Sequence, residues 1–174
     1  MQASKRHLLA LLASAPVLGA TLGLGGCGFA LRGRAQYAFQ SLYLQAPEGS
    51  ELGRSLLRQL AASSHDLQLL LPPQTSADAD VTLHLLGERH QRVVLAKTVA
   101  GQVRELQLRL RIKFKLRTPA GDELIPETEL LQQRDISYSE TIALAKEAEE
   151  ALLYRSMQTD LVQQLTRRLA AVQR

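Results

Sequence analysis

Residues 105–117, ELQLRLRIKFKLR, alternate strictly between polar and apolar side chains. The even positions are all apolar: Leu106, Leu108, Leu110, Ile112, Phe114 and Leu116. The odd positions are polar, and five in succession are cationic: Arg109, Arg111, Lys113, Lys115 and Arg117. Because successive side chains of a strand point to opposite faces, this pattern predicts a long strand with one face in a core and the other in water or on a partner.

Weaker patterns before and after this strand predict the remaining elements. In chain order these are a strand at 42–46, a helix capped by Ser50 and running to about residue 63, a strand at 67–71, a strand that begins at 81–85 and continues at 93–97 after a bulge, a return strand at 130–138, and a helix from Ser139 or Thr141 to the chain end. These elements predict an α+β fold. We expect a two-layer sandwich with two helices packed on one face of a mixed, mainly antiparallel sheet of four to five strands.

The amino-terminal segment has the three-part layout of a secretion signal. Lys5 and Arg6 precede an apolar run that is too short to span a bilayer, and the segment ends in Leu24-Gly25-Gly26-Cys27, which resembles a bacterial lipobox. Cys27 is the only cysteine in 174 residues. We expect it to carry an S-diacylglycerol and an N-acyl chain after removal of residues 1–26, and the alternative is a lone buried cysteine behind an ordinary signal. Gly28 stands where inner-membrane lipoproteins of enteric type often have Asp, which favours the outer membrane.

The mature chain is expected to be a lipidated tether, 27–38, followed by a single domain, 39–174. Loss of residues 1–26 leaves 148 residues and removes two cations and no acid, so the formal net charge falls from +4 to +2. This mild charge does not indicate nucleic-acid binding. No later apolar run approaches the ~20 residues of a spanning helix, so the expected lipid is the membrane anchor.

The chemistry-bearing residues do not predict catalysis or a metal site. His65, His84 and His90 lack the spacing of metal ligands. Ser64, His65 and Asp66 are the residue types of a hydrolase triad, but neighbours in sequence point in different directions and no Gly-x-Ser-x-Gly elbow is present. We therefore expect no enzyme activity, no metal and no cofactor apart from the covalent lipid on Cys27.

The cationic row at 109–117 has two interpretations. Same-face residues of a strand stand about 7 Å apart, so five cations would line up over roughly 27 Å. One interpretation is a solvated outer face to which neighbouring strands supply acids, with Glu127, Glu129 and Asp135 as candidates. The other is a surface for a polyanion carried among lipids, because phosphates pair well with Arg and Lys. A phosphorylated glycolipid is the anion that a lipid-anchored envelope protein would meet.

Three stretches resemble segments of one known family. Residues 27–33, CGFALRG, resemble a mature start of the form Cys-Gly-aromatic-x-Leu-Arg. Residues 55–60, SLLRQL, followed by the short strand at 67–71, resemble a first helix and second strand, and residues 142–147, IALAKE, resemble an Ala-Leu-Ala-Lys motif that opens a last long helix. The family is that of the LptE lipopolysaccharide-assembly lipoproteins. The resemblance covers nearly all of the mature chain in element order.

This resemblance implies a fold with two helices on one face of a mixed sheet. It implies an outer-membrane lipoprotein that plugs the LptD β-barrel, supports its assembly and helps deliver lipopolysaccharide to the outer leaflet. It also implies lipopolysaccharide contacts through basic residues. The family's Lys falls on Lys146, and its second basic residue falls on Val99, for which Lys97 or Arg104 could substitute. The alternative for Lys146 is an exposed helix residue paired with Glu150.

The basic strand adds further candidates for lipopolysaccharide binding: Arg109, Arg111, Lys113 and Lys115. Whether this strand would touch the lipid or the barrel wall stays open at this stage. Two functions of other classes also stay open, an envelope adaptor or chaperone that binds periplasmic proteins and an envelope hydrolase that uses His65.

Overall fold

The computed structural model of the chain describes residues 35–139, 141 and 143–173. Cys27, the expected signal and most of the expected tether lie outside the described residues. The elements are, in chain order, β1 (Ser41–Gln45), α1 (Glu51–Ser63), β2 (Gln68–Leu70), the short 3₁₀ helix Ser76–Asp78, β3 (Val81–Lys97), β4 (Val103–Arg117), β5 (Glu123–Ser137) and α2 (Ala143–Ala170).

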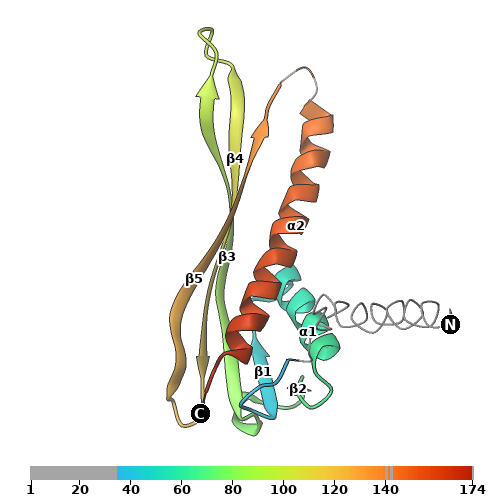
Figure 1. Cartoon of the computed structure of the whole chain (residues 1–174), viewed down its shortest axis with the longest axis vertical. Helices are drawn as coiled ribbons and strands as arrows, with labels where there is room; N and C mark the ends of the chain where they lie inside the picture. Colours follow the sequence, from blue (N-terminus) through green and yellow to red (C-terminus); the bar gives the residue numbers. More distant parts are fainter. Residues whose placement is uncertain (1–34, 140, 142, 174) are drawn as a thin grey trace, which may run out of the picture. The chain divides into compact units, whose positions relative to one another are not determined.

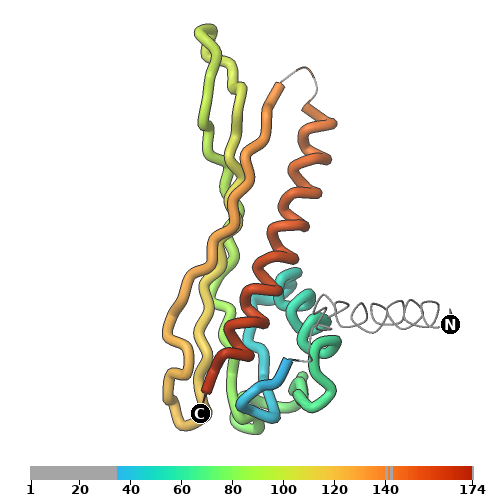
Figure 2. The backbone as a smooth tube through the Cα atoms, viewed as in Figure 1, coloured from blue at the N-terminus to red at the C-terminus, as the bar shows by residue number. Residues whose placement is uncertain are grey.

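The strands form a five-stranded sheet in the order β2-β1-β3-β4-β5 (Figure 1). β1 runs parallel to β2 and β3, whereas the long pairings of β3 with β4 and of β4 with β5 are antiparallel. Both helices cover one face of this sheet, which we call the inner face (Figure 2). The predicted α+β sandwich is confirmed.

The core lies between the inner face and the two helices. All six even residues of β4 from Leu106 to Leu116 are buried there against Leu52, Leu56 and Leu60 of α1 and the stripe of α2 that includes Met157 and Leu161. α1 begins as expected, because the Ser50 hydroxyl accepts a hydrogen bond from the Gly53 backbone N–H at 3.0 Å.

The predicted bulge in β3 is confirmed and has a large effect on which side chains face the helices. The register shifts between Leu85 and Gly87, so the residue parity of the strand reverses there. Before the bulge the odd residues, such as Leu83, pair with inner-face residues of β4. After it the even residues do so, and Arg92 therefore lies opposite Leu108.

β5 begins at Glu123, seven residues before the expected start at Leu130. The early part of this strand does not alternate and contains Pro126, so the sequence pattern alone does not predict a strand there. This segment is nevertheless a strand because it pairs with β4, where Leu116 lies opposite Ile125. Proline is tolerated because β5 is an edge strand of the sheet that the described residues form.

The hairpin formed by β3 and β4 extends beyond the carboxyl end of β5 (Figure 1). Its turn is closed by a hydrogen bond from the Thr98 backbone N–H to the Gln102 carbonyl at 2.8 Å, and Gly101 supplies the positive φ of 83° that the turn requires. On the other side of β3, the pairing with β1 ends at His84, so the half of β3 beyond His84, its distal half, has no strand neighbour there among the described residues.

Two ion pairs between the sheet and α2 hold the long helix over the inner face. Arg92 of β3 donates from Nε to the Glu150 carboxylate at 2.6 Å. Arg134 of β5 donates from Nη2 to Asp160 at 2.8 Å. β3 and β5 flank β4 on its two sides, so these ion pairs connect α2 to both neighbours of β4.

Candidate functional site: a basic sheet face

The face of the sheet opposite the helices carries the odd residues of β4, and β3 adds one more cation to them. Arg89 lies directly opposite Arg111 in the pairing of β3 with β4. Directly opposed residues of paired strands project to the same face. We call this surface the outer basic face and define it by its six cations: Arg89, Arg109, Arg111, Lys113, Lys115 and Arg117.

Acids of β5 neutralise part of this face. Arg111 Nη1 lies 3.0 Å from a Glu129 carboxylate oxygen, and Lys113 Nζ lies 3.2 Å from Glu127. Arg117 pairs with Glu123, whose pKa is lowered by the hydrogen bond from that guanidinium. The expectation that neighbouring strands supply acids is thus confirmed for Glu127 and Glu129, and Glu123 is an acid that the sequence analysis missed.

The third expected acid, Asp135, lies on the same face but forms no direct ion pair with a cation of β4 among the described residues. Its carboxylate accepts a hydrogen bond from the Gln107 side-chain amide at 2.9 Å, and the carbonyl of the same amide accepts one from Arg109 Nε at 2.6 Å. Gln107 therefore stands between the acid and the cation and uses both ends of its amide. The register is the reason, because Asp135 lies opposite Gln107 and not opposite a cation.

Among the described residues, the β3 side of the outer basic face has no comparable set of ion-paired acids. Within the described part of the chain, Arg89 and Lys115 form no ion pair. Opposite Lys115 lies His84, whose pKa is lowered by burial first and then by the charges of Lys115 and Arg117. The part of this lowering that the two cations cause is consistent with the positive charge on this side of β4.

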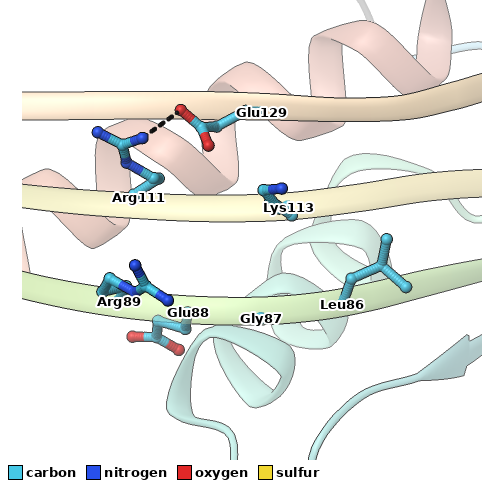
Figure 3. A pocket seen from close by; sticks show the side chains of 7 residues that line it. All are labelled: Leu86, Gly87, Glu88, Arg89, Arg111, Lys113 and Glu129. Carbon is cyan, nitrogen blue, oxygen red and sulfur yellow. Dashed lines mark ion pairs between the residues drawn. The ribbon is translucent and has the colours of Figure 1, made fainter.

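A cavity of about 400 Å³ opens in the outer basic face at the β3 bulge (Figure 3). Its lining residues come from three neighbouring strands: Leu86, Gly87, Glu88, Arg89, Arg111, Lys113 and Glu129. In Figure 3 Arg89 and Arg111 project to the same side of the sheet, whereas the Glu88 side chain points to the opposite side of β3. Arg111 also keeps a buried Nε that has no hydrogen-bond partner among the described residues.

Lys146 lies in the first turns of α2, away from the outer basic face. Its ammonium donates to the Glu149 carboxylate at 2.7 Å and to the Ser137 hydroxyl at 3.1 Å. Its side chain is 14% exposed, so the alternative of an exposed lysine paired with Glu150 is wrong. The carboxylate of Glu150 instead lies against Arg92, because the helix turns that residue toward β3.

The hairpin candidates lie at a third location. Lys97 lies opposite Val103 near the end of β3, with Arg104 next along β4, and both are exposed. Val99, at the family's basic position, lies in the turn and is fully exposed. The structure therefore brings Arg109, Arg111, Lys113 and Lys115 together on one face and leaves Lys146, Lys97 and Arg104 outside that row.

Two of the three residues that have the types of a hydrolase triad, Ser64 and Asp66, contact each other in a turn. The Ser64 hydroxyl accepts a hydrogen bond from the Asp66 backbone N–H at 3.3 Å, which forms a turn at the end of α1. No three His, Cys, Asp or Glu side chains come together in a metal-binding arrangement within 35–139, 141 and 143–173. None of the helices in the same ranges is long and apolar enough to cross a membrane.

A cluster on the inner face was not foreseen from the sequence. The Tyr154 hydroxyl donates to the Gln91 carbonyl at 2.9 Å, and its ring packs edge-on against His90 with centroids 4.6 Å apart. Burial raises the pKa of Tyr154, and the hydrogen bond to Glu150 raises the pKa of Arg92. These contacts join the distal half of β3 to α2.

Two solved structures with a similar arrangement of helices and strands are named as lipoproteins. The solution structure of lipoprotein B from Nitrosomonas europaea matches with a TM-score of 0.69 and 26% identity, covering 80% of this chain and 87% of that one. The crystal structure of the rare lipoprotein B from Shewanella oneidensis, at 22% identity, has the same fold, with a TM-score of 0.64 over 75% of this chain and 94% of that one. The class of fold is therefore the one that these lipoproteins share.

The chain belongs to the LptE lipopolysaccharide-assembly family, whose model matches residues 39–169. The LPS-assembly lipoprotein LptE of Yersinia pestis is 29% identical over 156 residues, which are 88% of this chain and 72% of that protein. The family resemblance is thereby confirmed. Members of this family are non-enzymatic lipoproteins, and membership gives the chain a role in lipopolysaccharide assembly at the bacterial envelope.

Proposed function

We propose that this chain is an outer-membrane lipoprotein, anchored by acyl chains on Cys27, whose domain at 39–174 plugs the lumen of the LptD β-barrel. In this position it supports barrel assembly and helps deliver lipopolysaccharide to the outer leaflet, whose anionic groups its basic residues bind. Residues 1–26 are the removed signal and 27–38 the tether. The family membership supports the role, and the protein requires no cofactor beyond its own lipid.

One structural observation carries the proposal. The outer basic face is left uncovered by the helices, while the opposite face of the same sheet is filled by the core. A domain of this kind presents a cationic surface without using any core residue. Such a surface suits phosphate groups or acidic side chains of a surrounding wall.

The partner is tested by extraction of the native lipoprotein at its native level in mild detergent. We expect a large β-barrel protein to co-purify with it. Recovery of the lipoprotein alone would contradict the plug. Recovery with soluble periplasmic proteins would support the adaptor or chaperone function instead.

The lipid anchor is tested by mass spectrometry of the purified protein, which should show acyl chains on an amino-terminal Cys27. An unmodified thiol, or a chain that still carries residues 1–26, would contradict the anchor.

The lipid-binding role of Lys146 is tested by Lys146→Gln, which removes the charge and keeps a donor for Ser137. We expect weaker lipopolysaccharide binding with an unchanged unfolding temperature. Arg155→Gln, an exposed cation on the same helix, is the control. Equal lipopolysaccharide binding by both variants and the wild type would remove Lys146 from the lipid-binding residues. The variants Lys97→Gln and Arg104→Gln would test the hairpin candidates in the same way.

A further inference from the structure

The cavity at the β3 bulge has the features of a ligand site and not of a packing defect. We propose that it binds the phosphate monoester of an amphiphile, with Arg89 and Arg111 as its donors. This inference deepens the proposed function, on which it rests for the class of ligand, by placing one phosphate at a defined point of the outer basic face (Figure 3).

The floor of the cavity is a glycine that the backbone does not require. Gly87 lies opposite Lys113, and its φ is not in the left-handed region. A Cβ placed on it would meet nothing within 4 Å. The missing side chain therefore leaves space above the sheet where any other residue would project into the cavity.

The walls of the cavity hold cations that the protein itself does not fully neutralise. Arg89 and Arg111 are directly opposed across two strands, so their Cβ atoms are about 5 Å apart, and like charges in this position are destabilising. Arg111 shares its charge with Glu129 at 3.0 Å, but Arg89 has no ion pair within the described residues. An anion between the two guanidinium groups would relieve the repulsion.

The donor set favours a phosphate over a carboxylate. A phosphate monoester offers three charged oxygens, enough to accept from two guanidinium groups and from the Lys113 ammonium, and it carries close to two negative charges. A carboxylate has two oxygens and one charge, and Glu129 already fills that role on the β5 side. Guanidinium groups are suited to such multidentate binding.

Two exposed leucines flank the cations and indicate what the phosphate is attached to. Leu86 lines the cavity and is 42% exposed. Leu131 lies directly opposite Arg111 on the β5 side and is 41% exposed. Apolar side chains beside a phosphate site suit an amphiphile better than a free ion, because they would cover apolar surface of the ligand.

The experiment measures binding of the full-length lipoprotein, purified in mild detergent, to phosphorylated lipid A and to the same lipid after removal of its phosphates. The variants are Arg89→Gln, which removes the unpaired donor, and Gly87→Val, which fills the floor without changing charge. Valine is favourable in strands, so this variant should fold. Arg155→Gln is the charge-matched control on α2, and inorganic phosphate is added as a competitor.

We expect both cavity variants to weaken binding of the phosphorylated lipid about tenfold, because Arg89→Gln loses one charge-assisted hydrogen bond and Gly87→Val places a side chain where the phosphate would lie. Binding of the dephosphorylated lipid and the behaviour of Arg155→Gln should stay unchanged. If inorganic phosphate displaces the phosphorylated lipid at concentrations as low as those at which the lipid itself binds, the site recognises free phosphate. That result would overturn the proposal that the ligand is an amphiphile.

Other outcomes separate this inference from the proposed function. If the wild type prefers the phosphorylated lipid and both cavity variants show the same preference, the cavity is not the phosphate site. The proposed function, lipopolysaccharide binding by the domain, would be unaffected by that result. If the wild type does not distinguish the two lipids, phosphate recognition itself fails. If the variants lose a co-purifying protein while keeping lipid affinity, the cavity is a protein contact and the inference is overturned.

Discussion

The two faces of β4 are built from neighbouring residues and have opposite relations to their surroundings. On the inner face, the even residues from Leu108 to Leu116 are completely buried. On the outer face, the intervening cations remain partly or wholly exposed. The inner face gains its free energy from burial of apolar area, whereas exposed ion pairs contribute only about 0–1 kcal/mol each. Stability and ligand recognition are therefore assigned to separate sides of one strand.

The outer face is itself asymmetric. Its acids come from β5, with Glu123, Glu127 and Glu129 paired to cations of β4, while on the β3 side Arg89 adds positive charge. A face that served only solubility would gain from acids on both sides. The excess of cations on the β3 side is the feature that a ligand would use.

The largest expected effect comes from the inner face. Phe114→Ala should lower the free energy of unfolding by about 3–5 kcal/mol, because it removes a fully buried ring and leaves a cavity. Lys113→Ala, one residue earlier on the outer face, should cost at most about 1 kcal/mol. Urea denaturation of both variants measures the difference. Equal losses of unfolding free energy would show that the inner face does not contribute more to stability than the outer face.

The second effect concerns the contact between the inner face and α2. Arg92→Ala should destabilise the fold by about 1–3 kcal/mol, because it leaves the carboxylate of Glu150, which is 8% exposed, without its ion-pair partner. The double variant Arg92→Ala with Glu150→Gln should recover part of this loss. A double-mutant cycle from urea titrations gives the coupling, and a coupling of zero would mean that water replaces the guanidinium.

Local patterns in the sequence predicted the elements whose register is set by their own residues. Strict alternation predicted β4, and Ser50 predicted the start of α1. The bulge in β3 was predicted too, but not its consequence. Because it reverses the parity of the strand, Arg89 faces outward and Arg92 faces the helix, and no local pattern distinguishes the two arginines. Partners across strands, such as Glu123 for Arg117, depend on a register that the early part of β5 does not reveal.

A smaller effect, of opposite sign, is expected on the outer face. Arg89→Gln should raise the free energy of unfolding by a few tenths of a kcal/mol, because it removes the repulsion with Arg111. The gain should shrink as salt is added, since salt screens exposed charges. Arg117→Gln, which loses the pair with Glu123, is the control and should destabilise slightly. Thermal unfolding at low and high salt measures both, and a destabilised Arg89→Gln would mean that this cation already has a partner.

The smallest effect is a pH dependence at His84. Its pKa is lowered from 6.5 by burial and by Lys115 and Arg117, so the unfolded chain binds the proton more readily than the folded one. Stability should therefore fall as the pH drops from 7 through 6.5 and below, and His84→Gln should remove that part of the decline. The same unfolding titration of His65→Gln, a histidine outside the outer basic face, leaves His84 in place and should keep the decline that His84 causes. Added salt should weaken the contribution of the two cations and leave that of burial. A pH profile of His84→Gln identical to the wild type would show that the pKa of His84 is not lowered in the fold, and the imidazole would no longer support a positive potential on the β3 side.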